Sequence, residues 1–319
     1  MSTFTLKGSD PSCTVHLTDN LTKASLENFP AFKNWIATLQ HSLSLQQDKD
    51  HTFHSAPYKL RKIDVQAADW FGEKKLGFVK LQAEVTNDNE EWLPGAVFLR
   101  GGSVGMLIIL QPDDVEEGTE TDKHVLLTVQ PRIAAGSLAL AELPAGMLDD
   151  GTFSGKAAQE IFEETHLEVP ENHLINMTDL ALSNVTTSPF TQKGLEEVKK
   201  DGKDVKVDGK DVRLDGKDVK KDEKDIKKAG KDLREKLQNA MYPSPGACDE
   251  FIPLFLYQKR VPRSELDGWR GKLTGLRNEG EKITIKLVKL EELWKEGGRD
   301  AKALAALALY EGLKREGKT

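Results

Sequence analysis

The chain has little of what marks a secreted, membrane-spanning or disulfide-stabilised protein. Its 319 residues include two cysteines, Cys13 and Cys248, too few and too far apart in sequence for a disulfide framework or a zinc site. No apolar run approaches the roughly 18–20 residues of a membrane span. The first ten residues, MSTFTLKGSD, have neither a secretory nor an Arg-rich targeting pattern. We therefore expect an intracellular, cytoplasmic protein without a membrane partner.

An excess of positive charge is also missing. Lys and Arg number 45 against 52 Asp and Glu, which gives a formal net charge of -7. This balance argues against a general nucleic-acid binder, because such a protein needs cations that neutralise phosphates. The chain is long enough to bury a full core, and we expect one large domain with a smaller partner.

Residues 1–95 predict a small β-rich N-terminal region. Apolar residues in 31–45 are spaced for an amphipathic helix, and strand-like runs follow at 58–65 and 76–85. No chemistry stands out in this region. A β-rich region that precedes an enzyme domain often supplies a dimer contact or a contact to substrate, and we expect one of these roles here.

Residues 96–319 have an α/β pattern. Apolar, branched runs predict strands, and the chain ends in an amphipathic helix over 300–314. The predicted strands are 104–110, 124–130, 138–143, 174–185, 251–258 and 283–290.

A charged seven-residue repeat interrupts this domain at 195–238. Its units read DGKDVKV, DGKDVRL, DGKDVKK and DEKDIKK; one apolar position is common to all of them, and a second is filled only by Val207 and Leu214. A coiled coil needs two such positions per heptad, and each glycine costs a helix about 1 kcal/mol relative to alanine. We read the segment as a low-complexity insertion, weakly helical or disordered, with a partner-binding coiled coil as the alternative.

Three glutamates gather on one face of a predicted helix in the middle of the chain. Glu160, Glu163 and Glu164 are spaced by three and four residues, and an apolar face that includes Phe162 and Thr165 lies opposite. The simplest reading is a solvated acidic face. Like charges near a helix C-terminus are unfavourable, however, and a divalent cation such as Mg²⁺ accounts for them better.

An arginine follows the second predicted strand of the α/β domain. The planar guanidinium of Arg132 matches the geometry of phosphate oxygens. If this end of the strand faces a cleft, we expect Arg132 to bind a phosphate of the ligand. A surface arginine without a function is an equal alternative.

The glutamate helix and its flanking segments resemble the Nudix hydrolases. The family signature is G-x5-E-x7-R-E-U-x-E-E-x-G-U, where U is aliphatic, and residues 159–167 read QEIFEETHL after Gly146. The segments ELPAGMLDD, SPGACDE and GLRNEGEKITIKLV are similar to the branch that hydrolyses ADP-ribose and ADP-sugars. The resemblance covers about 95–190 and 241–315. It implies an α/β/α sandwich with a mixed sheet, preceded by the β-rich region.

The resemblance also implies an Mg²⁺ site, in which Mn²⁺ could substitute. The implied ligands are the Ala145 carbonyl and the carboxylates of Glu160, Glu163, Glu164 and Glu281. Such metals neutralise a diphosphate and activate the attacking water.

Catalysis and substrate binding are implied for further residues. Glu163, Glu279 and Glu281 would position or deprotonate the water, and Arg132 and Glu142 would bind substrate. The expected reaction is hydrolysis of an ADP-sugar to AMP and a sugar phosphate, carried out by a homodimer.

The chain departs from the signature at three places. Gln159 replaces the arginine that orients the glutamates, His166 replaces a glycine, and neither Gly151 nor Thr152 supplies the first glutamate. The alternative function is therefore a degenerate Nudix module that binds a nucleotide or a protein partner without turnover.

Overall fold

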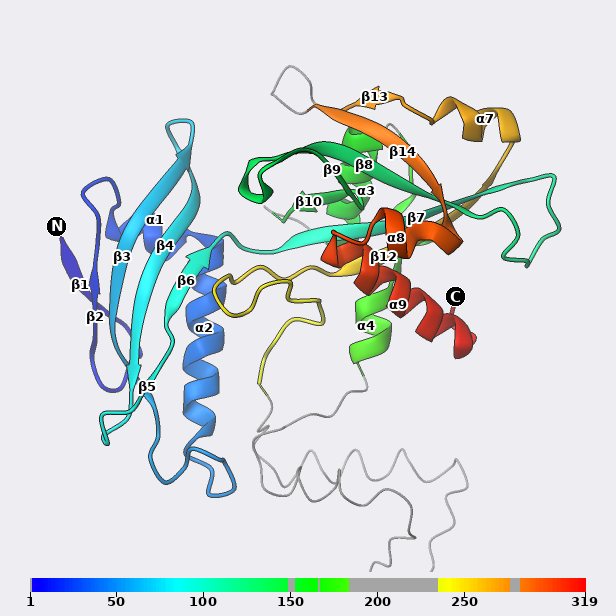
Figure 1. The fold of residues 1–319 in the computed structure, drawn as a ribbon. Helices are drawn as coiled ribbons and strands as arrows, with labels where there is room; N and C mark the ends of the chain where they lie inside the picture. The colour runs from blue at the N-terminus through cyan, green and yellow to red at the C-terminus, as the bar shows by residue number, and fades with distance from the viewer. Residues whose placement is uncertain (1, 149–152, 166, 184–234, 276–281) are drawn as a thin grey trace, which may run out of the picture.

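Two β-sheets, each with its own helices, make up the protein (Figure 1). The structure is a computed structural model that describes residues 2–148, 153–165, 167–183, 235–275 and 282–319. Of the predicted insertion at 195–238, residues 195–234 lie outside these ranges. Within them, no helix is long and apolar enough to cross a membrane.

The first sheet belongs to the N-terminal part of the chain. Its strands are β1 (Thr3–Leu6), β2 (Cys13–His16), β3 (Lys59–Phe71), β4 (Lys75–Thr86), β5 (Trp92–Leu93) and β6 (Ala96–Leu99). The order is β1-β2-β3-β4-β5, with β6 also paired to β4, and only β2 and β3 run parallel. The predicted strands at 58–65 and 76–85 are confirmed, and both extend further than predicted.

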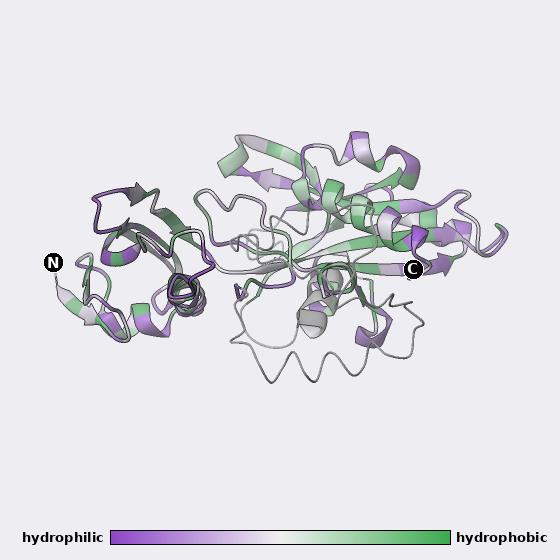
Figure 2. Ribbon diagram, turned by 90° about the horizontal axis from the view of Figure 1, so that it is seen from below, coloured by the Kyte–Doolittle hydropathy of each residue, from purple (hydrophilic) through white to green (hydrophobic). Residues whose placement is uncertain are grey.

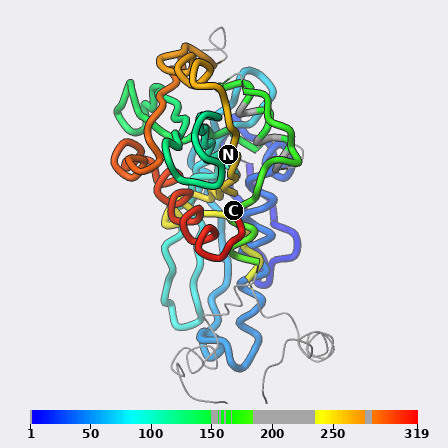
Figure 3. Tube along the Cα trace, turned by 90° about the vertical axis from the view of Figure 1, so that its right-hand side faces the viewer, coloured from blue at the N-terminus to red at the C-terminus, as the bar shows by residue number. Residues whose placement is uncertain are grey.

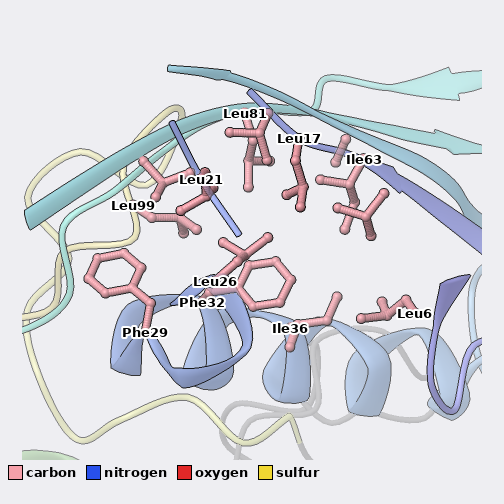
Figure 4. Close-up of a cluster of buried hydrophobic side chains, with 14 of the residues drawn as sticks. Leu6, Leu17, Leu21, Leu26, Phe29, Phe32, Ile36, Ile63, Leu81 and Leu99 are labelled. Atoms are coloured by element: carbon pink, nitrogen blue, oxygen red, sulfur yellow. The ribbon is translucent and has the colours of Figure 1, made fainter. Parts of the chain in front are cut away.

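Helices α1 (Lys23–Asn28) and α2 (Pro30–Leu45) close one face of this sheet. Pro30 stands at the first position of α2, where its missing N–H is not needed. Figure 4 shows Phe32 and Ile36 of α2 directed at Ile63 and Leu81 of the sheet. The core of the first sheet is therefore sandwiched between its strands and α2.

The second sheet carries most of the α/β region. Its strands are β7 (Ser103–Pro112), β8 (His124–Arg132), β9 (Ser137–Glu142), β10 (Ala145–Met147), β11 (Ile175–Asn176), β12 (Leu254–Val261), β13 (Leu273–Thr274) and β14 (Ile283–Lys289). Strand β12 pairs in parallel with β7, and the other described pairings are antiparallel. The sheet is mixed, as the resemblance implied.

Helices cover both faces of the second sheet. Along β7, Met106 and Ile108 face one core and Leu107 and Ile109 face the other, because successive strand residues point to opposite sides. The first core contains residues after α3 (Phe153–Thr165) and from α7 (Arg263–Gly268); the second contains residues of α4 (Met177–Leu182), α8 (Leu293–Glu296) and α9 (Ala301–Arg315). Figure 2 shows hydrophobic residues, in green, along the strands of this sheet. The predicted α/β/α layering is confirmed.

The strand predicted over 174–185 is wrong for the residues that the structure describes. Only Ile175–Asn176 is extended, as β11, and Met177–Leu182 forms α4. The Asn176 side chain accepts a hydrogen bond from the backbone N–H of Asp179 and caps the helix. Helix α4 packs beside α9, as Figures 1 and 3 both show.

The segment that follows the insertion returns to the junction between the two sheets. The backbone N–H of Phe98 donates to the Ala247 carbonyl at 2.7 Å, and the Asp249 carboxylate accepts the N–H groups of Arg100 and Gly101. Gly101 has a φ of 82°, which favours glycine. This contact fixes the linker between β6 and β7.

Candidate active site

The buried glutamate of the acidic helix, Glu164 of α3, faces the sheet and contacts β8 and β10. Glu164 is 5% exposed. The Gln130 amide donates to its Oε1 at 3.3 Å, and the Ala145 N–H donates to its Oε2 at 3.1 Å. These two donors are neutral, so the two bonds orient the carboxylate without adding a positive charge.

The backbone of Ala145 is turned toward this helix. The Pro144 carbonyl accepts a hydrogen bond from the Met106 N–H, and the Leu148 N–H donates to the Gly102 carbonyl. Residues 144, 146 and 148 are therefore the ones whose backbone groups form hydrogen bonds with β7. In an antiparallel pair these positions alternate, and the N–H and C=O of Ala145 both face away from β7. The N–H reaches Glu164, and the carbonyl faces the same side.

Glu163 lies next to Glu164 on the more exposed side of the helix. The Gln159 side-chain amide donates to Glu163 Oε1 at 2.6 Å. The residue that replaces the signature arginine therefore still contacts a signature glutamate, through a neutral donor.

The sequence predicted Phe162 on the packed face of α3, and this prediction is wrong. Phe162 is 48% exposed, whereas Thr165 is fully buried. A helix turns about 100° per residue, so Phe162 is about 200° from Glu164, which points inward. The buried Glu164 and Thr165 define the face against the sheet.

Arg132 and Glu142 form an ion pair at the end of β8 and β9. The Arg132 Nε donates to Glu142 Oε1 at 2.5 Å, and the Glu142 side chain is 5% exposed. The second oxygen, Oε2, accepts from Lys302 Nζ of α9 at 3.2 Å. One buried carboxylate therefore joins two cations.

Asp300, which caps α9, completes this network. Its Oδ1 accepts from the backbone N–H and from Nζ of Lys302, both at 3.0 Å, and its Oδ2 accepts the Leu143 N–H at 2.8 Å. Burial alone would lower the pKa of Lys302, but the Asp300 and Glu142 carboxylates outweigh it and raise that pKa. Lys302 is charged throughout the neutral range.

Part of the predicted site lies outside the described residues. This holds for Glu279, Glu281, His166, Gly151 and Thr152, and for the side chain of Glu160, although α3 includes its backbone. Among the described residues, no three or more His, Cys, Asp or Glu side chains are grouped to hold a metal. The described donors that suit a hard cation are Glu163, Glu164 and the Ala145 carbonyl.

A cavity of about 740 Å³ lies between the two sheets, close to this site. Trp70, Lys74 and Lys75 line it from the β3–β4 hairpin, Arg100 from the linker and Met147 from the end of β10. Met147 is two strand residues, about 7 Å, from Ala145. None of the described lining residues is an Asp or a Glu.

Three residues of the site were not predicted from the sequence. Gln130 orients Glu164, and Lys302 and Asp300 hold the segment from Glu142 to Ala145. Gln130 and Arg132 lie two residues apart on one strand, and regular alternation would place both on the same side of the sheet. This alternation could have identified Gln130 from the sequence. The other two lie 157 residues or more beyond their partners, and no local pattern connects them.

Comparison with known proteins identifies the family. Nudix hydrolase 14, chloroplastic, of Arabidopsis thaliana is 30% identical over 289 residues, which are 90% of this chain and 71% of that protein. The chain belongs to the Nudix hydrolase family.

A Nudix hydrolase is an enzyme, and this chain is therefore a hydrolase with a mixed α/β fold. No family model matches the sequence. A solved structure described as an ADP compounds hydrolase is 14% identical, with a TM-score of 0.41, and is similar over 82% of this chain and 99% of its own.

Proposed function

We propose that this Nudix hydrolase cleaves the diphosphate of an ADP-sugar, ADP-ribose or ADP-glucose, in a reaction that requires Mg²⁺. The observation that carries the proposal is the position of Glu164. Its buried carboxylate, the neighbouring Glu163 and the Ala145 carbonyl bring hard oxygen donors to one end of α3. Oxygen donors of this kind suit Mg²⁺, and Mn²⁺ can replace it.

A bound Mg²⁺ would neutralise charge on the diphosphate oxygens. The chain itself supplies the orientation. Gln130 and the Ala145 N–H hold Glu164, and Gln159 holds Glu163. In our proposal, water attacks one phosphorus, the bridging P–O bond breaks, and AMP and a sugar phosphate leave. Glu279 and Glu281 would position that water or take its proton.

The substrate would extend from the glutamates toward the cavity between the sheets. The Arg132 side chain is 42% exposed, and three cations line a cavity that has no described carboxylate in its lining: Lys74, Lys75 and Arg100, which also pairs with Glu250 through Nη1. The Arg100 Nε is buried and has no hydrogen-bond partner among the described residues. Trp70 adds an aromatic surface on which a base could stack. Cations beside an aromatic surface suit a nucleoside diphosphate, so the N-terminal region is proposed to contact substrate.

Glu164→Gln tests the proposal. The change keeps the size of the side chain and removes the charge that a cation needs. AMP release from ADP-ribose should therefore fall by about a hundred- to a thousandfold, the scale of other single electrostatic groups in active sites. Turnover by wild type should require Mg²⁺ and should stop when a chelator removes it. Glu168→Gln, an exposed residue just after the helix, is the matched control and should keep full activity. Undiminished AMP release in Glu164→Gln would refute the assignment.

Gln159 favours one alternative, a Nudix module that binds a nucleotide or a protein partner without turnover. Its neutral amide holds Glu163 less strongly than an arginine would. Thermal stabilisation by ADP-ribose without any AMP formed would support this alternative.

We also propose a homodimer. The hairpin between β8 and β9 exposes Ile133 by 76% and Leu138 by 77%, close to Arg132. Two exposed apolar side chains on one projecting hairpin are typical of an interface. Light scattering should give twice the chain mass for wild type and the single mass for the double variant Ile133→Ser, Leu138→Ser.

A further inference from the structure

The two carboxylate oxygens of Glu142 bind two different cations, Arg132 through Oε1 and Lys302 through Oε2. Arg132 uses its Nε to reach Glu142 Oε1, and its Nη1 and Nη2 make no hydrogen bond to another described residue. An arginine that meets a carboxylate alone commonly binds both oxygens, through Nε and one Nη or through two Nη groups. Here the second oxygen already accepts from Lys302.

Lys302 is itself held rigidly. Its Nζ donates to Asp300 as well as to Glu142, and its side chain is 13% exposed. Its aliphatic part passes over β7 at Gly105, where a Cβ would lie 3.4 Å from Lys302 Cδ. The ammonium group therefore has a fixed place on the Oε2 side of Glu142.

We propose that Lys302 is a positioning residue: by holding the second oxygen of Glu142, it restricts Arg132 to one bond and leaves both terminal guanidinium nitrogens facing an anionic substrate. The role in catalysis rests on the proposed function. Lys302 acts through Glu142 and Arg132 and does not touch the substrate. Two carboxylates, Glu142 and Asp300, and two cations, Lys302 and Arg132, make the cluster neutral as a whole.

The first test needs no substrate. Phenylglyoxal reacts with accessible guanidinium groups, and peptide mass spectrometry measures the labelling of Arg132 against that of the exposed Arg270. In Lys302→Met, Glu142 Oε2 is released to Arg132, and the labelling rate of Arg132 should fall about fivefold, in line with the loss of one charged hydrogen-bonding site. Lys302→Arg should restore it. Lys286→Met, which removes an exposed lysine paired with Glu296, should leave it unchanged.

The second test separates binding from turnover. Lys302→Met should raise the KM for ADP-ribose about tenfold, the value of one hydrogen bond to a charged group, and change kcat less than about twofold. In an Arg132→Ala background the same change should have almost no further effect on KM, because the two residues act through one contact. A purely structural role would lower kcat as well, and its effect would add to that of Arg132→Ala.

The outcomes distinguish the two proposals. Unchanged labelling of Arg132 overturns the role of Lys302 whatever the activity. In an active enzyme, full additivity of the KM effects in the double variant overturns it as well. Reduced labelling of Arg132 in Lys302→Met, combined with a wild type that releases no AMP from any ADP-sugar, supports the positioning role of Lys302 and overturns the proposed function. If Lys302→Met does not fold, as circular dichroism would show, Lys302→Gln is used instead. Its neutral amide holds Glu142 Oε2 less strongly than the ammonium group does, so the labelling and KM should change in the same direction by a smaller factor.

Discussion

Neighbouring glutamates of one helix are placed in different environments. Glu164 is buried and held by two donors, whereas Glu163 is partly exposed and is held by the Gln159 side chain, which is itself exposed. A carboxylate fixed in advance costs no reorganisation when a cation or substrate arrives. Glu163 depends on a contact that a side-chain rotation can break.

Gln159→Arg should therefore raise activity. The guanidinium would replace the neutral donor to Glu163 Oε1 by a charged one, about twice as strong, so kcat for ADP-ribose should increase about three- to tenfold. Steady-state kinetics at saturating Mg²⁺ would measure it. Gln159→Ala, which removes the donor, serves as the comparison and should lower kcat; an arginine variant no faster than the alanine variant would show that this contact does not limit turnover.

The sequence predicts site residues only where the signature is local. Glu163 and Glu164 follow from the spacing in α3 and the resemblance, and the structure shows Glu164 beside Ala145. Gln130 and Lys302 could not be predicted in the same way, because their contacts join residues 34 and 160 positions apart. Such pairs exist only once the folded sheet has brought α3 to β8 and α9 to β9.

At the scale of elements, α9 fixes the strand that leads to the site. Asp300 caps the helix with one oxygen and binds the Leu143 N–H with the other. The start of the C-terminal helix and the segment before Ala145 are therefore joined by a single buried carboxylate, which is 6% exposed.

Asp300→Ala should be strongly destabilising. Loss of a helix cap costs about 1 kcal/mol, and a buried N–H left without its acceptor costs about 1–3 kcal/mol more, so the free energy of unfolding should fall by about 2–4 kcal/mol. Urea unfolding followed by circular dichroism measures the change. Asp267→Ala, at an exposed position of α7, should alter it by no more than about 0.5 kcal/mol. Equal effects of the two changes would contradict the assigned role of Asp300.

Most elements follow from hydrophobic periodicity. The buried strands β7 and β8, the helix α2 and the terminal helix α9 were predicted to within a few residues. The prediction failed at 174–185, where a short apolar run is compatible with either a strand or a buried helix. The Asn176 cap and the packing of α4 on α9 decide in favour of the helix, and only the cap is visible in the sequence.

At the scale of the whole molecule, the linker between β6 and β7 connects the core of the first sheet to the two cores of the second sheet. The first core contains residues up to Leu99, and the other two begin at Val104 and Leu107. The residues between them are held by the 244–251 segment, from the far side of the insertion. Arg100 Nη1 pairs with Glu250 at 2.9 Å, and Asp249 accepts two backbone N–H groups of the linker.

Asp249→Asn should make the stability less dependent on pH. Burial raises the pKa of Asp249 above its ordinary value, even though the N–H groups of Arg100 and Gly101 act to lower it. The folded state therefore holds this proton more tightly than the unfolded state. The stability that the carboxyl contributes is fully present below the unfolded pKa, near 3.9, and is lost as pH rises through the higher folded pKa. The asparagine keeps an acceptor for the linker and has no proton to lose.

The difference in unfolding free energy between the two proteins isolates this one group, because the other titrating residues are common to both and cancel. Measured by urea unfolding at a series of pH values from about 3 upward, the stability of Asp249→Asn relative to wild type should increase through the window above the ordinary Asp pKa and then level off. A relative stability that falls through the same window would mean that the linker N–H groups outweigh burial and that Asp249 is stabilised as the anion. The sign of that slope thus decides whether the junction between the two sheets is held by a carboxylate that favours its charge or by one that tolerates it.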